Sequence, residues 1–256
     1  MTGATGGLGR AIAGALHDRG ASLLLTGRKT GVLEDMKSEL SERVEVLAAD
    51  LRSAEELSAL TGRASAVDVL VANAGHPGTG RLDRLDRDEI DEVIDVNLRA
   101  PIQLTRALLP AMLKRGSGHV VLISSLAGKV ANPRSTLYSA TKFGLRGFGL
   151  ALHEELHGTG VGVTTVCPGF IRDAGMFVRS GTKLPPGMGT SSPEEVARAV
   201  IRGIESNKRE IDVAPLTMRS GVRIFTVAPS VGSALSRALG AGKIAASIAE
   251  GHRDTR

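Results

Sequence analysis

The chain has 256 residues, enough for one large α/β domain or two small ones, and its 42% hydrophobic and 23% charged residues are typical of a folded globular protein. Its single cysteine, Cys167, excludes an intrachain disulfide. No uncharged run reaches the length of a membrane-spanning helix, and the first residues lack a basic-then-apolar leader, so we expect a cytoplasmic protein without a transmembrane segment.

The net charge of +5 raises the question of a nucleic-acid partner, because clustered basic residues neutralise phosphates. The basic residues are scattered along this chain, and residues that stack on bases are scarce, with no Trp, one Tyr and five Phe. We therefore expect no nucleic-acid binding.

Short apolar runs alternate with longer segments of helical spacing. Five runs have the length and β-branching of buried parallel strands, namely residues 22–26, 44–48, 67–72, 119–123 and 161–166. Six segments have helical spacing, namely residues 7–19, 32–43, 54–62, 88–114, 137–157 and 193–206. This alternation predicts right-handed crossovers and a doubly wound parallel sheet in a single α/β domain.

Two segments depart from the alternation. Residues 174–192 are irregular, with four Gly and two Pro, and such a stretch in a compact domain is typical of a functional lid. We assign this lid to a domain of residues 1–214 and expect a helical extension over residues 215–256. Its apolar, Gly-interrupted part, residues 222–249, fits packing on the lid, oligomer contacts or a membrane surface equally well.

Glycines cluster in Thr2-Gly3-Ala4-Thr5-Gly6-Gly7-Leu8-Gly9, directly before a predicted helix. Glycine lets backbone N–H groups approach a pyrophosphate, whose charge a helix N-terminus favours. The spacing differs from the G-x-G-x-x-G fingerprint, so a tight turn before a helix is the alternative.

The turn after the next strand, Gly27-Arg28-Lys29, lacks the acid that holds the ribose hydroxyl of NAD. It therefore favours NADP over NAD, with Arg28 at the 2′-phosphate and Lys29 or Arg10 as further candidates. A solvated basic turn is the alternative.

Tyr138 is the only tyrosine, and Lys142 lies four residues later on the same face of a predicted helix. A nearby ammonium lowers the pKa of a phenol, so Tyr138 would exchange a proton with a carbonyl oxygen while a hydride moves at the carbon. A half-buried ring beside a snorkelling lysine is the alternative.

The chain resembles the short-chain dehydrogenase/reductase family from Thr2 to about Ala214. The motifs in the family's order and spacing are Thr2-Gly3-x-x-x-Gly7-x-Gly9, Asn73-Ala74-Gly75, Asn97, Ser125, Tyr138-x-x-x-Lys142 and Pro168-Gly169. The resemblance implies a Rossmann fold. It also implies an NAD(P)-dependent oxidoreductase that acts on a carbonyl or alcohol.

The same resemblance implies roles for individual residues. Tyr138 is the acid/base, Ser125 positions the substrate oxygen, and Asn97 holds a water in the proton relay behind Lys142. The implied cofactor contacts are Gly3, Thr5, Gly7, Leu8, Gly9, Arg28, Asp50, Leu51, Asn73, Ala74, Gly75, Tyr138, Lys142, Pro168, Gly169 and Ile171. Within that set, Asp50 and Leu51 match the adenine contact.

Two departures from the family pattern matter. Asp173 stands where the family commonly has a Thr that bonds the carboxamide or a phosphate, and an acid there would repel phosphate. Only Met1 precedes Thr2, where the family has a strand in the middle of the sheet, between residues 22–26 and 67–72. We therefore expect the sheet to lack its first strand, and the native protein to begin several apolar residues upstream.

The run His153-Glu154-Glu155-Leu156-His157 reads as H-E-x-x-H, which on a helix presents two zinc ligands. We find no third ligand, so we expect a polar helix end and no metal site.

The leading prediction is hydride transfer between NADP(H) and a small-molecule carbonyl or alcohol, by a homo-oligomer. The alternative is a catalytically silent NADP-binding regulatory or scaffold protein, against which the intact Ser125, Tyr138 and Lys142 argue. The apolar lid, with Arg179 and Lys183, is compatible with a lipid-like or acidic ketone.

Overall fold

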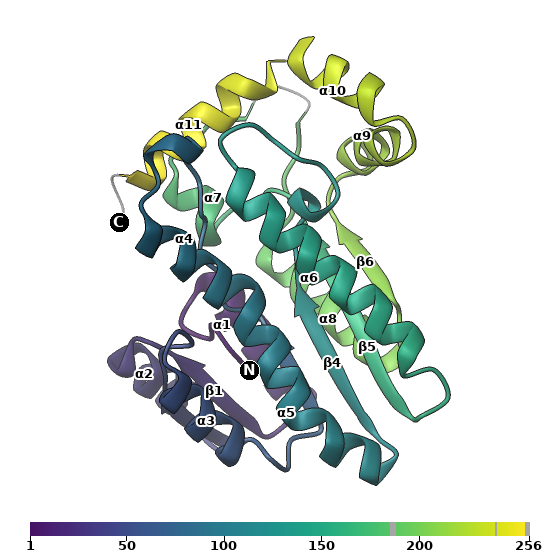
Figure 1. The fold of residues 1–256 in the computed structure, drawn as a ribbon. Coiled ribbons are helices and arrows are strands. Elements are labelled where there is room, and N and C mark those ends of the chain that lie inside the picture. Colours follow the sequence, from purple (N-terminus) through teal and green to yellow (C-terminus); the bar gives the residue numbers. More distant parts are fainter. Residues whose placement is uncertain (185–187, 239, 254–256) are drawn as a thin grey trace.

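Parallel strands form the centre of the molecule, with helices on both faces (Figure 1). The computed structural model describes residues 1–184, 188–238 and 240–253. Its strands are β1 (Leu23–Gly27), β2 (Val44–Ala48), β3 (Val69–Ala72), β4 (Gly118–Ile123), β5 (Val161–Pro168) and β6 (Glu210–Val213). The predicted parallel α/β fold is confirmed.

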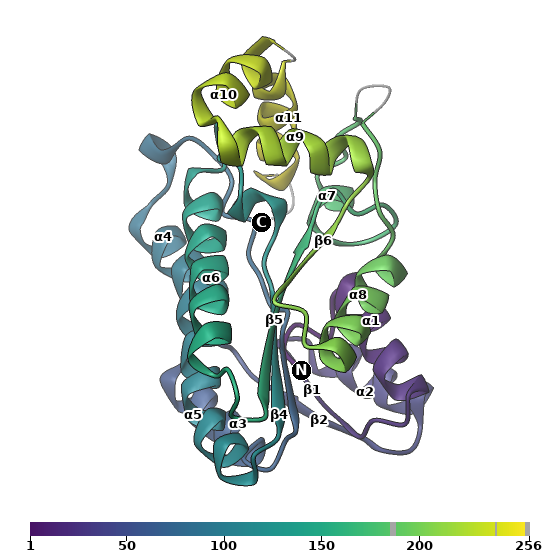
Figure 2. The same ribbon diagram turned by 90° about the vertical axis from the view of Figure 1, so that its right-hand side faces the viewer.

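Seven longer helices pack on the two faces of the strands. One face carries α1 (Gly7–Asp18), α2 (Thr30–Leu40) and α8 (Pro193–Ser206), and the other carries α3 (Ala54–Arg63), α4 (Arg87–Ile94), α5 (Ala100–Arg115) and α6 (Thr136–Glu155), as Figure 2 shows. Successive side chains of a strand point to opposite faces. Accordingly, Val120 and Leu122 of β4 pack toward α5 and α6, whereas Val121 and Ile123 pack toward α1 and α8.

The strands form two separate ladders. β1 pairs with β2, and the other four strands pair in the order β3-β4-β5-β6. The first residues of the chain lie between the ladders: the Thr2 N–H donates to the Val71 carbonyl at 2.9 Å, and the Thr26 N–H donates to the Met1 carbonyl at 3.0 Å. The gap lies where the sequence predicted it, and this short segment joins the two ladders just before the glycine cluster.

The predicted helix over residues 88–114 is interrupted. A π-helical turn, η2 (Asp95–Arg99), separates α4 from α5. Asn97 in this turn is fully buried, and its amide bonds the backbone of His76 rather than lying on a regular helix surface. Such π turns occur mostly at functional sites.

The segment predicted to be irregular, residues 174–192, contains a short helix, α7 (Gly175–Arg179). Residues 185–187 of that segment lie outside the described residues. The short strand β6 was not predicted, because only two of its four side chains are apolar and a four-residue run gives little periodicity. Its Glu210 and Asp212 pair with Lys129, at 2.6 and 2.5 Å, instead of facing a core.

Two short 3₁₀ turns, η1 (Leu82–Arg84) and η3 (Leu126–Gly128), complete the body of the molecule. After β6 come three further helices, α9 (Leu216–Val227), α10 (Pro229–Ala238) and α11 (Ala241–Arg253). They lie over the carboxyl ends of the strands, as Figure 2 shows. No helix in the described part of the chain is both long and apolar enough to cross a membrane.

Candidate active site

A cavity of about 690 Å³ opens at the carboxyl ends of the strands, the usual position of a ligand in a doubly wound sheet. Every residue predicted to contact the cofactor lines it, and so does Ser125. Asn97 alone among the predicted site residues does not line it and lies behind the wall. The sequence motifs therefore meet in one cavity, although they are spread over 169 residues from Gly3 to Ile171.

The glycine cluster folds as a loop in which two positions, Gly3 and Gly9, have no room for a side chain. Gly3 has a φ of +65°, and a Cβ built there would lie 2.7 Å from the Cα of Ala74; a Cβ on Gly9 would lie 2.2 Å from the Gly3 carbonyl oxygen. The Asn73 amide donates to the Gly3 carbonyl at 3.0 Å, and the Thr2 hydroxyl accepts from the Asn73 N–H at 3.1 Å. These contacts hold the loop so that the N-terminus of α1 faces the cavity.

Charged side chains gather at the far end of this loop. Arg28, after β1, lies 3.4 Å from a carboxylate oxygen of Glu92 on α4, and Arg52 lies 3.4 Å from the same carboxylate. Arg52 also bonds Asp50 in a forked pair, which lowers the pKa of that carboxyl. The sequence analysis missed Arg52 and Glu92. Arg52 was signalled by its place beside Asp50, whereas Glu92 lies 64 residues from Arg28 and had no local signal.

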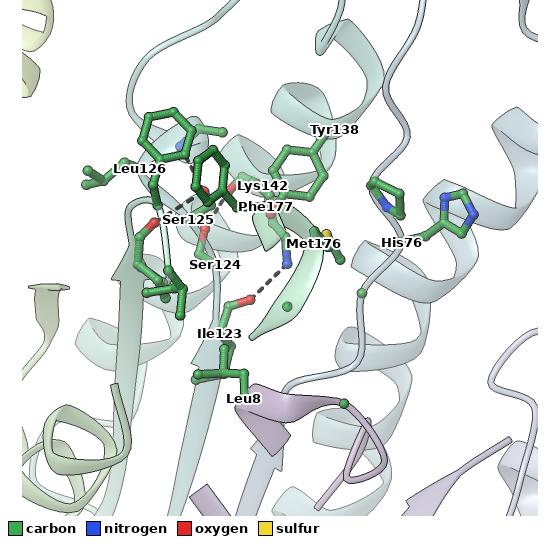
Figure 3. Close-up of a pocket in the computed structure, with 18 of the residues that line it drawn as sticks. Leu8, His76, Ile123, Ser124, Ser125, Leu126, Tyr138, Lys142, Met176 and Phe177 are labelled. Carbon is green, nitrogen blue, oxygen red and sulfur yellow. Dashed lines mark hydrogen bonds between the residues drawn. The ribbon is translucent and has the colours of Figure 1, made fainter. Parts of the chain in front are cut away.

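The predicted catalytic side chains converge beside this loop, as the close-up in Figure 3 shows. Ser125 lies after β4, where its hydroxyl donates to the Pro168 carbonyl at 3.4 Å and accepts from the Ala127 N–H at 3.1 Å, and it lines the same cavity as Tyr138 of α6. Lys142, one helical turn further along α6, is 3% exposed; its Nζ donates to the Ile123 carbonyl at 2.9 Å and lies 5.7 Å from the centre of the Tyr138 ring.

The pKa of Tyr138 changes in the direction opposite to the one expected from the sequence. Loss of solvent around the phenol raises its pKa, and the polar Ser125 hydroxyl nearby opposes that rise. Burial also lowers the pKa of Lys142 to about 8. The expected depression of the Tyr138 pKa by Lys142 is not seen, because desolvation dominates at both groups.

Asn97 holds the loop after β3 rather than facing the cavity. Its Oδ1 accepts from the His76 N–H at 2.7 Å, and its Nδ2 donates to the His76 carbonyl at 2.9 Å and to the Thr141 hydroxyl at 3.2 Å. The side chain thus links the loop to α6, one residue before Lys142.

Three other residues discussed for the sequence have clear surroundings. The Ser124 hydroxyl donates to the Lys142 carbonyl at 3.0 Å, which is a structural contact. The Asp173 side chain is 74% exposed and pairs with Arg172. His153 of the H-E-x-x-H run bonds the Val163 carbonyl, and within the described ranges no group of three or more His, Cys, Asp or Glu is placed to hold a metal.

The second half of the cavity is apolar and was not predicted in detail. It is lined by residues of α9 and α11 together with the lid and the turn after β4, among them Leu126, Val130, Met176, Phe177, Met218, Val222, Phe225, Ile244 and Ile248. The sequence signalled this half only as an apolar segment after Ala214, because nothing local indicates which helix face returns to the sheet.

Comparison with known proteins agrees with this arrangement. The family model described as short chain dehydrogenase matches residues 1–184. A ketoacyl reductase, HetN, of Nostoc sp. strain PCC 7120 is 37% identical over 220 residues, which are 83% of this chain and 77% of that protein. Nodulation protein G of Rhizobium sp. strain N33 is 40% identical over 178 residues, 68% of this chain and 73% of that protein.

Solved structures are similar over most of their length. Actinorhodin polyketide ketoreductase with NADPH has a TM-score of 0.75 at 32% identity, covering 83% of this chain and 94% of that one. Serine dehydrogenase complexed with NADP⁺ has a TM-score of 0.75 at 28% identity, covering 84% and 94%. With the glycine loop, the Ser125, Tyr138 and Lys142 cluster and the parallel sheet, these matches show that the chain belongs to the short-chain dehydrogenase/reductase family of NAD(P)-dependent oxidoreductases.

Proposed function

We propose that the protein transfers a hydride between NADP(H) and a carbonyl or alcohol substrate, with Tyr138 as the general acid/base. The observation that carries this proposal is the meeting of Ser125, Tyr138 and Lys142 in the same cavity as the glycine loop. A nicotinamide bound there would supply or accept the hydride. The chain's own residues would bind it, hold the substrate oxygen and move one proton.

The residues present fit a dinucleotide. A Cβ on Gly9 would enter the loop backbone, so Gly9 lets the loop lie close to the start of α1, whereas a Cβ on Gly7 would lie 2.5 Å from the Cβ of Ala174, so Gly7 lets the start of the lid approach α1. Backbone N–H groups at that helix start favour a pyrophosphate. Asn73 and Gly75 form the next wall, and Gly75 leaves room beside Lys142, whose Nζ lies 3.8 Å from the position of a Cβ there.

The choice of NADP over NAD rests on the charges after β1. Arg28 and Lys29 are exposed at the cavity, and Arg28 is held only by a 3.4 Å contact with Glu92. The 2′-phosphate of NADP is an anion, so the Arg28 guanidinium would donate a forked pair of hydrogen bonds to it. The neutral 2′-hydroxyl of NAD would attract this cation less.

The proton step follows from the pKa directions. The raised pKa of Tyr138 keeps the phenol protonated at neutral pH, so it is ready to donate a proton to a carbonyl oxygen during reduction. Ser125, which lines the cavity with Tyr138, would donate to the same oxygen. The Lys142 ammonium near the ring then stabilises the phenolate that remains, because an opposite charge favours the ionised form.

The test is a panel of carbonyls and alcohols assayed by the absorbance of the reduced nicotinamide, with the parent and a Tyr138→Phe variant. Turnover that needs Tyr138 supports the proposal. Tight NADPH binding with no turnover of any compound would instead support a silent cofactor-binding protein. Equal turnover by parent and variant would exclude Tyr138 as the proton donor.

A further inference from the structure

The C-terminal helices complete the cavity on the side away from the glycine loop. From α9, Met218, Val222 and Phe225 reach it, and from α11, Ile244 and Ile248 do. Val222 packs with Leu126 and Val130 of the body in one buried cluster, so α9 is part of the cavity wall. Met176 and Phe177 of the lid helix α7 line the same cavity. Figure 3 shows these two lid residues beside Tyr138 and Lys142.

α11 is fastened to the lid by specific contacts. His252 is 4% exposed; its Nε2 donates to the Met176 carbonyl at 2.8 Å, and its Nδ1 accepts from the Thr79 hydroxyl at 2.9 Å. A Cβ on Gly251 would lie 1.9 Å from the Ser180 carbonyl oxygen, so the helix touches the end of α7 backbone to backbone. Lid, loop and C-terminal helix therefore form one enclosure over the cavity.

The enclosure is mostly apolar, although Arg179 of the lid helix, Thr217 of α9 and His252 of α11 also line it. Its α9 and α11 walls present aliphatic, thioether and aromatic side chains, while the hydroxyls of Ser125 and Tyr138 lie at its base. Among the described residues that line the cavity, the acids Asp50 and Glu92 both lie at the opposite, Arg28 end. Burial of apolar groups is thus the main favourable term for a substrate in this half.

We infer that α9 and α11 select a substrate whose carbonyl or carbinol carbon carries an extended apolar chain, with Ile248, Ile244 and Val222 contacting that chain. This inference rests on the proposed function and adds the substrate class. Each methylene that enters the enclosure is expected to raise kcat/KM about threefold to fourfold until the space is filled.

The test uses straight-chain methyl ketones from butanone to decan-2-one with NADPH. The parent should show kcat/KM rising along the series. Ile248→Phe narrows the enclosure, so it should lower kcat/KM for decan-2-one by about tenfold or more relative to kcat/KM for butanone. Lys243→Phe is the matched control, because it adds the same ring to an exposed position of the same helix. It should leave the whole series as in the parent.

A second variant removes volume instead of adding it. Ile248→Ala should lower kcat/KM for decan-2-one by roughly tenfold relative to kcat/KM for butanone, because the contact with the distal chain is lost. Binding of decan-2-one in the presence of NADP⁺, which has no hydride to give, is measured by calorimetry and makes the same comparison without turnover. The inference would be overturned if kcat/KM of the parent did not depend on chain length, or if both variants lost kcat/KM equally for butanone and decan-2-one.

The two possible failures are separable. If butanone is reduced through Tyr138 but chain length has no effect, the proposed function stands and the apolar selection is wrong. If the Tyr138→Phe variant reduces the ketones as well as the parent does, the proposed proton donor is wrong. The calorimetric comparison still decides whether α11 binds the apolar chain.

Discussion

The carboxylate of Glu92 lies 3.4 Å from a guanidinium nitrogen of Arg28, the residue predicted to recognise the cofactor's 2′-phosphate. The Arg28 side chain is 62% exposed, so this contact is weak, and a phosphate would compete for the same guanidinium. The negative charge of Glu92, on α4, would therefore oppose the binding of a 2′-phosphate at Arg28, although Arg28 follows β1.

This relationship predicts opposite effects of two substitutions. Arg28→Asp should weaken NADP binding by about tenfold to a hundredfold and change NAD binding little, because a hydrogen bond between charged groups is lost and a like charge is added. Glu92→Gln should strengthen NADP binding several-fold. Dissociation constants of both cofactors, measured by titration, check both results. An unchanged ratio of NADP to NAD affinity in Arg28→Asp would transfer the role to Lys29 or Arg10.

Tyr138→Phe should lower turnover by about 10² to 10⁴ while NADPH binding stays near that of the parent, because only the proton donor is removed. Since Tyr138 is the only tyrosine, ultraviolet titration reports its ionisation alone. From the raised pKa, the phenolate signal should appear above the ordinary value near 10 in the free protein. Ionisation below that value in the free protein would contradict the dominance of desolvation.

Two glycines on α1, Gly9 and Gly14, allow the effect of close backbone packing on cofactor binding to be distinguished from the effect of helix propensity on stability. Gly9→Ala should abolish NADPH binding, because its Cβ would lie 2.2 Å from the Gly3 carbonyl oxygen. Gly14→Ala is the control: a Cβ there meets nothing within 4 Å, so it should raise stability by about 0.5–1 kcal/mol and leave binding unchanged. Cofactor titration and urea unfolding of both variants check this. Normal NADPH affinity in Gly9→Ala would refute the assigned loop geometry.

His119 should make the fold sensitive to mild acid. Burial lowers its pKa to about 4 from an ordinary value near 6.5, so the unfolded chain binds more protons between these values. Stability is then lost as the pH falls from about 6.5 to about 4, by up to about 3 kcal/mol.

Replacing His119 with Gln should flatten this part of the stability curve, measured by urea unfolding at a series of pH values. His157→Gln is the comparison, because His157 is exposed in the turn that follows α6. This variant should keep the slope of the parent. An identical slope in the His119 variant would assign the acid sensitivity to other groups.

A feature of this fold could be predicted from the sequence when the residues that determine it lie close together in the chain. The first five strands, β1 to β5, and the glycine loop were predictable because periodicity and glycine conformation act within a few residues. The pairing of Tyr138 with Lys142 was predictable because they lie one helical turn apart. The direction of the Tyr138 pKa was not, since it depends on how much protein surrounds the phenol. Glu92 beside Arg28, and the fastening of His252 to Met176, depend on contacts between elements far apart in the chain.

Some expectations stay predictions. These are the division at residue 214, the homo-oligomer, the cytoplasmic location and the preference for NADP. The helical segment over residues 88–114 is helical throughout, but helical spacing did not reveal the π turn at Asp95–Arg99 from which Asn97 makes its buried bonds. The irregular lid was wrong in part, because a five-residue helix, α7, is too short to give a periodic signal.

The only thiol of the chain is fully buried beside the Lys129–Glu210 pair, and burial raises the pKa of Cys167 to about 12. The thiolate that reacts with alkylating reagents is therefore scarce at neutral pH. Cysteines introduced at exposed positions, such as Val178 on the lid helix and Lys243 on α11, would take up spin labels or dyes without a background from the native residue. The distance between two such labels would report directly whether the enclosure opens when a ketone enters.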